Sequence, residues 1–164
     1  MLVTPDGRAV QGYSAKDPTT GAIITTGQPS NIIVPPGVLR PPVASTQFTT
    51  NSNLNAAAVV GDTFTASVQI YDSVGTSHVA TITYTNTASG AWTYDIGVDG
   101  AEVTGGTPGT PTSLKAGSLS FDASGVLSQV DGAAAANVTI VGPAWADGAA
   151  PIDIVWAVLD ANNV

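Results

Sequence analysis

The stretch from residue 66 to residue 84 constrains the fold most, because apolar and polar residues alternate through both of its halves. Period two with β-branched and aromatic residues is typical of β-strands. Between the halves, Asp72 can accept a hydrogen bond from the backbone two residues on, and Gly75 can adopt a positive φ. The stretch is therefore predicted to be an antiparallel hairpin across a type I turn with a glycine bulge, pairing Ala66–Tyr71 with Val79–Tyr84.

The rest of the chain repeats this pattern. Asp122 and Gly125 have the same turn spacing, which predicts a second hairpin. No stretch of ten or more residues combines helical period with helix caps. The chain is therefore predicted to be all-β, an antiparallel β-sandwich or a partly closed β-barrel with an extended N-terminal β appendage. The second hairpin would pair Leu119–Phe121 with Val126–Ser128, with further strands over residues 46–54, 91–96, 137–141 and 152–159 and a long surface loop over 97–111.

The large apolar side chains on the strand faces define the expected core. Burial of one such side chain contributes about 1.5–3 kcal/mol to the free energy of unfolding. The residues expected to be buried are Val68, Ile70, Ile82, Trp92, Tyr94, Phe121, Ile154 and Trp156.

Prolines divide the chain into two regions. Pro35, Pro36, Pro41 and Pro42 lack backbone donors and favour extended geometry, so residues 38–45 are interpreted as a moderately stiff linker. The expected organisation is a first region over residues 1–45 and a second over residues 46–164.

The charge balance excludes several partners. The 164 residues carry a formal net charge of -8, with twelve acidic residues against four basic ones. Without a basic patch to neutralise phosphates, binding to nucleic acid is not expected, and anionic membranes are disfavoured for the same reason. No apolar run approaches the length of a membrane span. The absence of cysteine excludes disulfides and thiolate chemistry.

No pattern of residues predicts a catalytic, cofactor or metal site. His78 has no second histidine and no cysteine with which to share a metal. It is interpreted as a hydrogen-bonding residue after the turn, with a catalytic base as the alternative. Asp72 and Asp122 lack the closely spaced oxygens of a calcium loop, so both are interpreted as turn-forming carboxylates.

Two further groups have open alternatives. Asp95, Asp99 and Glu102 could form a weak cation site, but a solvated acidic loop is the preferred interpretation. Trp92 and Trp156 alternate on strands and are assigned to the core, whereas Trp145 lies in an Ala/Gly loop and suits either the core or stacking on a sugar ring.

The first hairpin also carries a resemblance to a known family. Residues 70–78, Ile-Tyr-Asp-Ser-Val-Gly-Thr-Ser-His, resemble the "VYDSLG…H" signature of the bacterial flagellar hook protein family. Other segments resemble that family in the same order along the chain. They are residues 2–13 ("L…G…V.GY"), 32–35 ("I.IP"), 53–56 ("NLN"), 119–127 ("L.F…G.L") and 152–154 ("I.ID").

The resemblance implies a structural role. Residues 46–164 would be most of the outer β-domain of a hook subunit, and residues 1–45 part of the inner β-domain plus the linker. The subunit would be exported unfolded and would assemble with other copies outside the cell, in the universal joint that transmits motor torque to the filament. Rod, hook-cap and hook–filament junction proteins would be partners of the full-length chain, and the isolated fragment would be monomeric.

Two further expectations complete this interpretation. Residues 1–45 should be less well ordered or packed as an appendage, because their partner strands would lie in the missing part of the subunit. The alternative function is a carbohydrate- or surface-binding β-module of a phage tail or adhesin, using Trp145 and the loop over residues 97–111.

Overall fold

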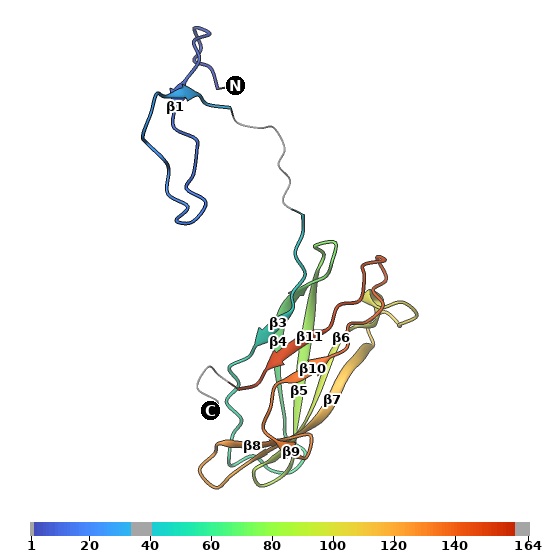
Figure 1. Cartoon of the computed structure of the whole chain (residues 1–164). Helices are drawn as coiled ribbons and strands as arrows, with labels where there is room; N and C mark the ends of the chain where they lie inside the picture. The colour runs from blue at the N-terminus through green and yellow to red at the C-terminus, as the bar shows by residue number, and fades with distance from the viewer. Residues whose placement is uncertain (1, 34–40, 160–164) are drawn as a thin grey trace. The chain divides into compact units, whose positions relative to one another are not determined.

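The computed structural model describes residues 2–33 and 41–159. The chain divides into two compact units, Met1–Pro41 and Pro42–Val164 (Figure 1). The helical structure in the described residues is one short 3-10 element, η1 (Gly100–Glu102). Among those residues no helix has the length and apolarity that a membrane crossing needs. The prediction of an all-β chain is confirmed.

The first unit contains little regular structure. Its strands β1 (Gln11–Gly12) and β2 (Ser30–Asn31) form one antiparallel pair. No residue between positions 2 and 33 is buried. These described residues therefore have no hydrophobic core of their own.

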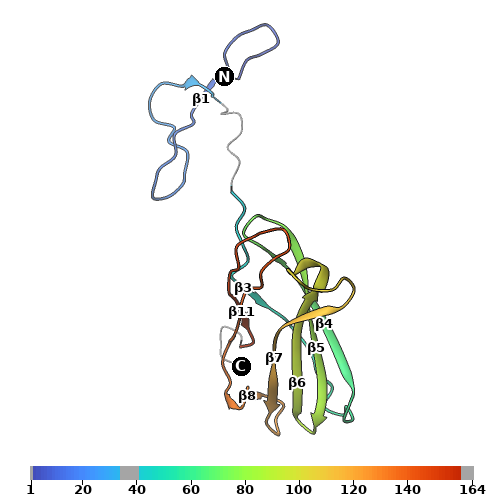
Figure 2. The same cartoon turned by 90° about the vertical axis from the view of Figure 1, so that its right-hand side faces the viewer.

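The second unit is a two-layer β-sandwich. The larger sheet is antiparallel and has the order β4-β5-β6-β7-β8-β9, and the smaller has the order β10-β11-β3. Figures 1 and 2 show the smaller sheet lying against one face of the long strands β4 to β7. The sheets remain separate, so of the two predicted architectures the sandwich is the one observed. The strands are β3 (Gln47–Thr49), β4 (Thr63–Tyr71), β5 (Ser77–Ala88), β6 (Ala91–Asp99), β7 (Pro111–Phe121), β8 (Leu127–Val130), β9 (Ala133–Ala134), β10 (Val138–Ile140) and β11 (Ile154–Ala157).

Both predicted hairpins form, but the return strand of the second is Leu127–Val130 rather than 126–128, so that Leu119 pairs with Val130. In the β4–β5 turn, Asp72 Oδ1 accepts hydrogen bonds from the N–H groups of Val74 and Thr76, each at 2.9 Å. Gly75 takes the positive φ of 90° that the bulge requires. Asp122 repeats this hydrogen bonding in the β7–β8 turn. The turn chemistry that the sequence indicates is therefore confirmed in both places.

The β6–β7 connection is shorter than predicted. β6 continues to Asp99 and β7 begins at Pro111, so the predicted loop over 97–111 is confined to residues 100–110. Val98 is buried, and a Cβ added to Gly97 would lie 3.0 Å from a carbonyl oxygen of β7. The Gly and Thr content suggested a loop, but burial and close backbone pairing keep this segment in the sheet.

The first and last predicted strands of the sandwich also differ from expectation. The strand predicted over 46–54 is reduced to β3, and the strand predicted over 152–159 is reduced to β11. The two pair parallel, with Phe48 opposite Trp156, although an antiparallel sandwich was predicted. This pairing joins the beginning and the end of the unit, and local sequence patterns carry no information on such a distant partner.

The buried residues largely follow the prediction. Val68 and Phe121 are half-buried rather than buried. Val68 lies on β4, an edge strand, and Phe121 lies at the end of β7 beside a cleft. The other six are buried as predicted: Ile70, Ile82, Trp92, Tyr94, Ile154 and Trp156.

Gly117 leaves room for a polar contact between β6 and the end of β8. The Tyr94 hydroxyl donates to both carboxylate oxygens of Asp131 at 3.1 Å, and Lys115 pairs with Asp131 at 3.1 Å. Burial and the bond to Asp131 raise the pKa of Tyr94 above its ordinary value. Burial also raises the pKa of Asp131, but the Ser118 N–H, Lys115 and Tyr94 outweigh it and hold that pKa below its ordinary value. A Cβ on Gly117 would collide with the Asp131 carboxylate and lie 2.6 Å from the Tyr94 hydroxyl.

We predict that Gly117→Ala lowers the free energy of unfolding by about 1–3 kcal/mol, because the added methyl group must displace Asp131 or Tyr94. Urea denaturation checks this prediction. Ala116→Ser is the control, since Ala116 is exposed on the same strand, and a change within about 0.5 kcal/mol is expected for it. Equal stabilities of Gly117→Ala and the wild type would contradict the packing described.

We also predict that the amides of residues 2–33 exchange with solvent faster than those of β4 and β5, because the first region buries none of its described residues. Hydrogen exchange followed by mass spectrometry measures the difference. Equal protection in the two segments would show that the first unit shares a stable core.

Candidate functional site

The most elaborate side-chain cluster of the described residues surrounds His78, near the start of β5. The imidazole is buried, with 4% of its residue surface exposed. Its Nε2 lies 3.1 Å from Asp72 Oδ2, and its Nδ1 lies 3.0 Å from Glu102 Oε2. The indole of Trp145 stacks on the ring, with a centroid separation of 3.7 Å and an interplanar angle of 13°.

Three connections at one end of the sandwich supply these side chains. Asp72 begins the β4–β5 turn, Glu102 ends η1 between β6 and β7, and Trp145 lies between β10 and β11. Val103, which follows η1, forms an isolated β-bridge with Trp145. The strands of the sandwich end together here, so residues far apart in the sequence meet around one ring.

Asp72 is held as a carboxylate by its surroundings. Burial raises its pKa, but the hydrogen bond to His78 and the N–H groups of Thr76 and Val74 outweigh burial and lower the pKa below its ordinary value. Each of the two carboxylate oxygens has at least one donor. The same turn motif therefore provides both a backbone cap and a negative partner for His78.

The cluster satisfies its own donors and acceptors, which limits its chemistry. Ligand atoms of Asp72, His78 and Asp147 lie within 4.8 Å of one another, the spacing of a possible metal site. Asp147 accepts hydrogen bonds from the Thr76 hydroxyl at 2.9 Å and from the Ala149 N–H at 3.0 Å. Because each of these three side chains already has hydrogen-bond partners, the geometry fits an internal hydrogen-bond network better than a cation site.

The remaining candidate residues do not converge. Asp95 accepts a hydrogen bond from Ser113, and Asp99 caps η1 by accepting from the Ala101 N–H at 2.7 Å. Glu102 faces His78 instead. The acidic residues that could have formed a weak cation site are therefore each bonded to separate partners.

Trp145 is buried, with 5% of its surface exposed, and stacks on His78. It was the residue on which the prediction of a carbohydrate-binding surface depended, and its face is already covered. The use of Trp145 for stacking on a sugar ring is thus corrected by the structure. Trp92 and Trp156 lie in the core, as predicted.

The outer face of the larger sheet holds a shallow groove of about 340 Å³ over β5, β6 and the start of β7. Asp95 and Asp99 are its charged residues, and Thr81 and Thr83 lie along its β5 side. The lining is mixed, because Val79, Val98 and Pro111 lie among these polar side chains.

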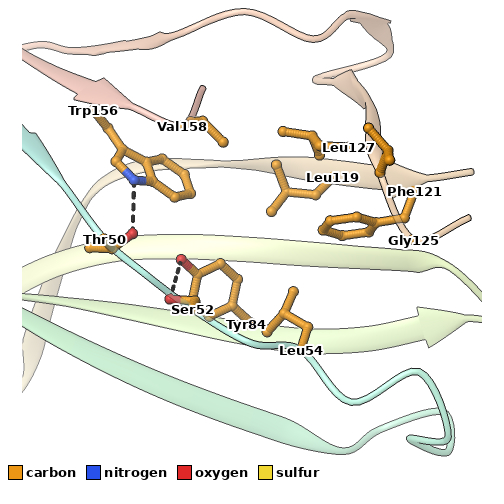
Figure 3. Close-up of a pocket in the computed structure, with 11 residues that line it drawn as sticks. Thr50, Ser52, Leu54, Tyr84, Leu119, Phe121, Gly125, Leu127, Trp156 and Val158 are labelled. Atoms are coloured by element: carbon orange, nitrogen blue, oxygen red, sulfur yellow. Dashed lines mark hydrogen bonds between the residues drawn. The ribbon is translucent and has the colours of Figure 1, made fainter. Parts of the chain in front are cut away.

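A second cleft of about 290 Å³ lies between the sheets, at the end away from His78. Figure 3 shows it beside the hydrogen bonds from Trp156 to Thr50 and between Ser52 and Tyr84. It exists because β5 has 12 residues and β11 has 4, so the smaller sheet ends before the larger one. Its apolar lining includes Leu54, Leu119, Phe121, Leu127 and Val158.

In this β-sandwich the polar side chains around His78 form hydrogen bonds to one another and link three connections. Such an arrangement is typical of a structural domain. Residues 44–163 match the family described as the flagellar basal body protein FlaE D2 domain, and the chain belongs to this family. The resemblance to the flagellar hook protein family is thereby confirmed.

A curated relative supports the same family. The chain is 30% identical over 151 residues to the flagellar hook protein FlgE of Rhizobium meliloti (strain 1021), an alignment that covers 90% of this chain and 35% of the relative. The chain thus spans about a third of that relative's length. A solved 32 kDa fragment of the hook protein FlgE from Caulobacter crescentus is similar at 16% identity and a TM-score of 0.48, over 61% of this chain and 40% of that one, and this weak likeness adds nothing to the assignment.

We predict that Asp72→Asn lowers the free energy of unfolding at pH 7. The variant should also lose less of this free energy than the wild type when the pH is lowered. The folded-state pKa of Asp72 is lowered, so its contribution is present above the ordinary pKa of about 4 and is lost as the pH falls below that value. Urea denaturation between pH 2 and pH 7 should show the wild-type and variant curves converging at the acid end.

Asp122→Asn provides a matched control for this prediction. Asp122 makes the same two bonds to the turn backbone but is exposed and has no bond to histidine. It should therefore change stability less than Asp72→Asn at pH 7. Equal effects of the two variants would show that only the turn matters.

Proposed function

We propose that this chain is part of a structural subunit of the bacterial flagellar hook. The observation that carries the proposal is the family match over residues 44–163, which includes nearly the whole sandwich. In this proposal residues 46–164 are the outer β-domain of the subunit, and residues 1–45 are part of its inner β-domain plus the crossing linker.

The geometry of the signature segment supports this role. Asp72, Gly75 and His78 are the signature positions that the hairpin uses, the first two for the turn and the third for the buried cluster. The signature residues thus have structural roles in this chain. A structural subunit is not a class of enzyme, and we propose no catalysis or cofactor for it.

We further propose that the full-length protein works in the universal joint that transmits motor torque to the filament, outside the cell. Its main partners would be other copies of itself, with rod, hook-cap and hook–filament junction proteins at the ends of the assembly. Contacts between outer domains would have to rearrange as the hook rotates, so they should be small and polar, because a large apolar interface holds one geometry. The Thr81, Thr83 and Ser113 hydroxyl groups in the groove over β5 and β6 offer polar contacts of this kind. The isolated chain is expected to be monomeric.

Deletion of the full-length gene tests the basic proposal. Cells should lose their hooks and their motility, and the gene supplied on a plasmid should restore both. Antibodies raised against residues 42–159 should label restored hooks in electron micrographs. Normal hooks in the deletion strain would overturn the proposal.

Thr81→Lys and Thr83→Lys in the full-length protein test the proposed sliding face. Both residues point outward into the groove, where a lysine would add bulk and charge. Export should continue, while hook curvature or swimming speed should change for at least one variant. Ala123→Lys is the control, because Ala123 is exposed in the β7–β8 turn outside this groove. Unchanged curvature and swimming for both threonine variants would remove this face from the contact, and tight saccharide binding in a glycan array would favour a binding module instead.

A further inference from the structure

The environment of His78 determines which protonation state its ring can adopt. A neutral imidazole has one N–H donor and one bare lone pair, whereas an ionised carboxylate can only accept. Each ring nitrogen of His78 faces a carboxylate oxygen, at 3.1 Å for Asp72 and 3.0 Å for Glu102. A neutral ring would leave a lone pair against a carboxylate oxygen in a buried site, and such a mismatch is costly. A ring protonated on both nitrogens donates to both carboxylates.

We propose that His78 is held as an imidazolium in the folded domain at neutral pH, and that this internal cation locks the three connections at its end of the sandwich. Loss of the proton at alkaline pH would release them. The device is a pH-sensitive lock built from Asp72, His78, Glu102 and Trp145.

The charges around the ring support the proposal. Asp72 faces it from the β4–β5 turn and Glu102 from η1, while Asp147, beside Trp145, lies close to the Asp72–His78 pair. Of the lysines and arginines that the structure describes, none pairs with these carboxylates. His78 is therefore the source of positive charge among three acidic side chains. The indole face of Trp145 further favours a cation at 3.7 Å.

The lock acts on bonds between the connections. The Ala146 N–H donates to the Glu102 carbonyl at 2.9 Å, and the Thr104 N–H donates to the Ala144 carbonyl at 2.8 Å. Without the ring's charge, the carboxylates repel one another and Glu102 loses its partner, so these bonds open more often. The register of β4 and β5 does not depend on them.

The direction of the pH effect follows from the proton count. At neutral pH the unfolded chain holds fewer protons on this histidine than the folded domain does in the proposal. Stability must then fall as the pH rises above neutrality. This is opposite to the acid-side loss that Asp72 contributes, so the two effects are separable by pH.

Nitrogen NMR tests the protonation state directly, because His78 is the chain's only histidine and its signals need no assignment. At pH 7 the ¹⁵N shifts of both ring nitrogens should be those of protonated imidazolium. A neutral ring at pH 7, with either nitrogen bare, overturns the proposal.

Glu102→Gln tests whether the Glu102 carboxylate holds the positive charge on His78 and whether that charge keeps the connections together. The amide keeps an acceptor but removes a negative charge, so the ring should lose its proton at a lower pH than in the wild type. Asp99→Asn is the matched control, since Asp99 caps the same 3-10 turn without contacting the ring, and it should leave the titration in place.

Hydrogen exchange reads out the release of the connections. As the ring titrates, the protection of the Ala146 and Thr104 amides should fall about tenfold relative to β5 amides measured at the same pH, the loss expected for a broken charged hydrogen bond. The fall should shift to lower pH in Glu102→Gln together with the NMR transition. Protection that stays constant through the titration would show that the ring's charge does not lock the connections.

Discussion

The contacts of Trp156 join the two sheets, and the rest of the sandwich depends on them. Its ring lies 5.2 Å from Tyr94 and 6.3 Å from Tyr84, both on the larger sheet, and 6.5 Å from Phe48 on β3. Its indole N–H donates to Thr50 Oγ at 3.1 Å, so the polar edge of the ring is satisfied although the side chain is buried. Without this residue the short smaller sheet has little else of comparable size with which to cover the strands opposite.

The parallel pairing of β3 with β11 has a further consequence for folding. It joins the first and last strands of the second unit, which are separated along the chain by the six strands of the larger sheet and by β10. The hairpins β4–β5, β5–β6 and β6–β7 are local and can form first. Closure by distant strands is slow and entropically costly, which a large aromatic anchor such as Trp156 helps to offset.

Local features of the fold could be predicted from the sequence, and distant pairings could not. The Asp72 and Asp122 turns follow from backbone chemistry within five residues, and period two assigns Ile82 and Tyr94 to the core. Gly97 and Val98 belong to a strand because β7 pairs with them, and the Gly-rich segment carries no sign of that partner. The shortness of β3 and its parallel direction likewise depend on β11, whose position only the completed sheet defines.

The same distinction applies to the His78 cluster. The sequence showed Asp72 and His78 six residues apart across a turn, and hydrogen bonding by the histidine was the preferred interpretation. Glu102 and Trp145 reach the ring from segments that are distant in sequence, and the predicted loop over 97–111 gave no reason to place Glu102 there. The bridge between Val103 and Trp145 brings both together. Sequence spacing can therefore indicate the Asp72–His78 pair, whereas Glu102 and Trp145 can be placed only when the strand topology is known.

The two ends of the sandwich therefore differ in how firmly they are held. At the end where the chain enters the second unit, Ser45 bonds to the backbone of Tyr71, and the cluster around His78 ties three connections together. At the opposite end the smaller sheet stops short, Phe64 is 40% exposed, and a cleft separates the layers. Local opening is easiest where few apolar contacts and bonds must be broken. By this argument the domain opens more easily at its far end than where the chain enters it, while the hairpin registers of the long strands keep the sheet intact.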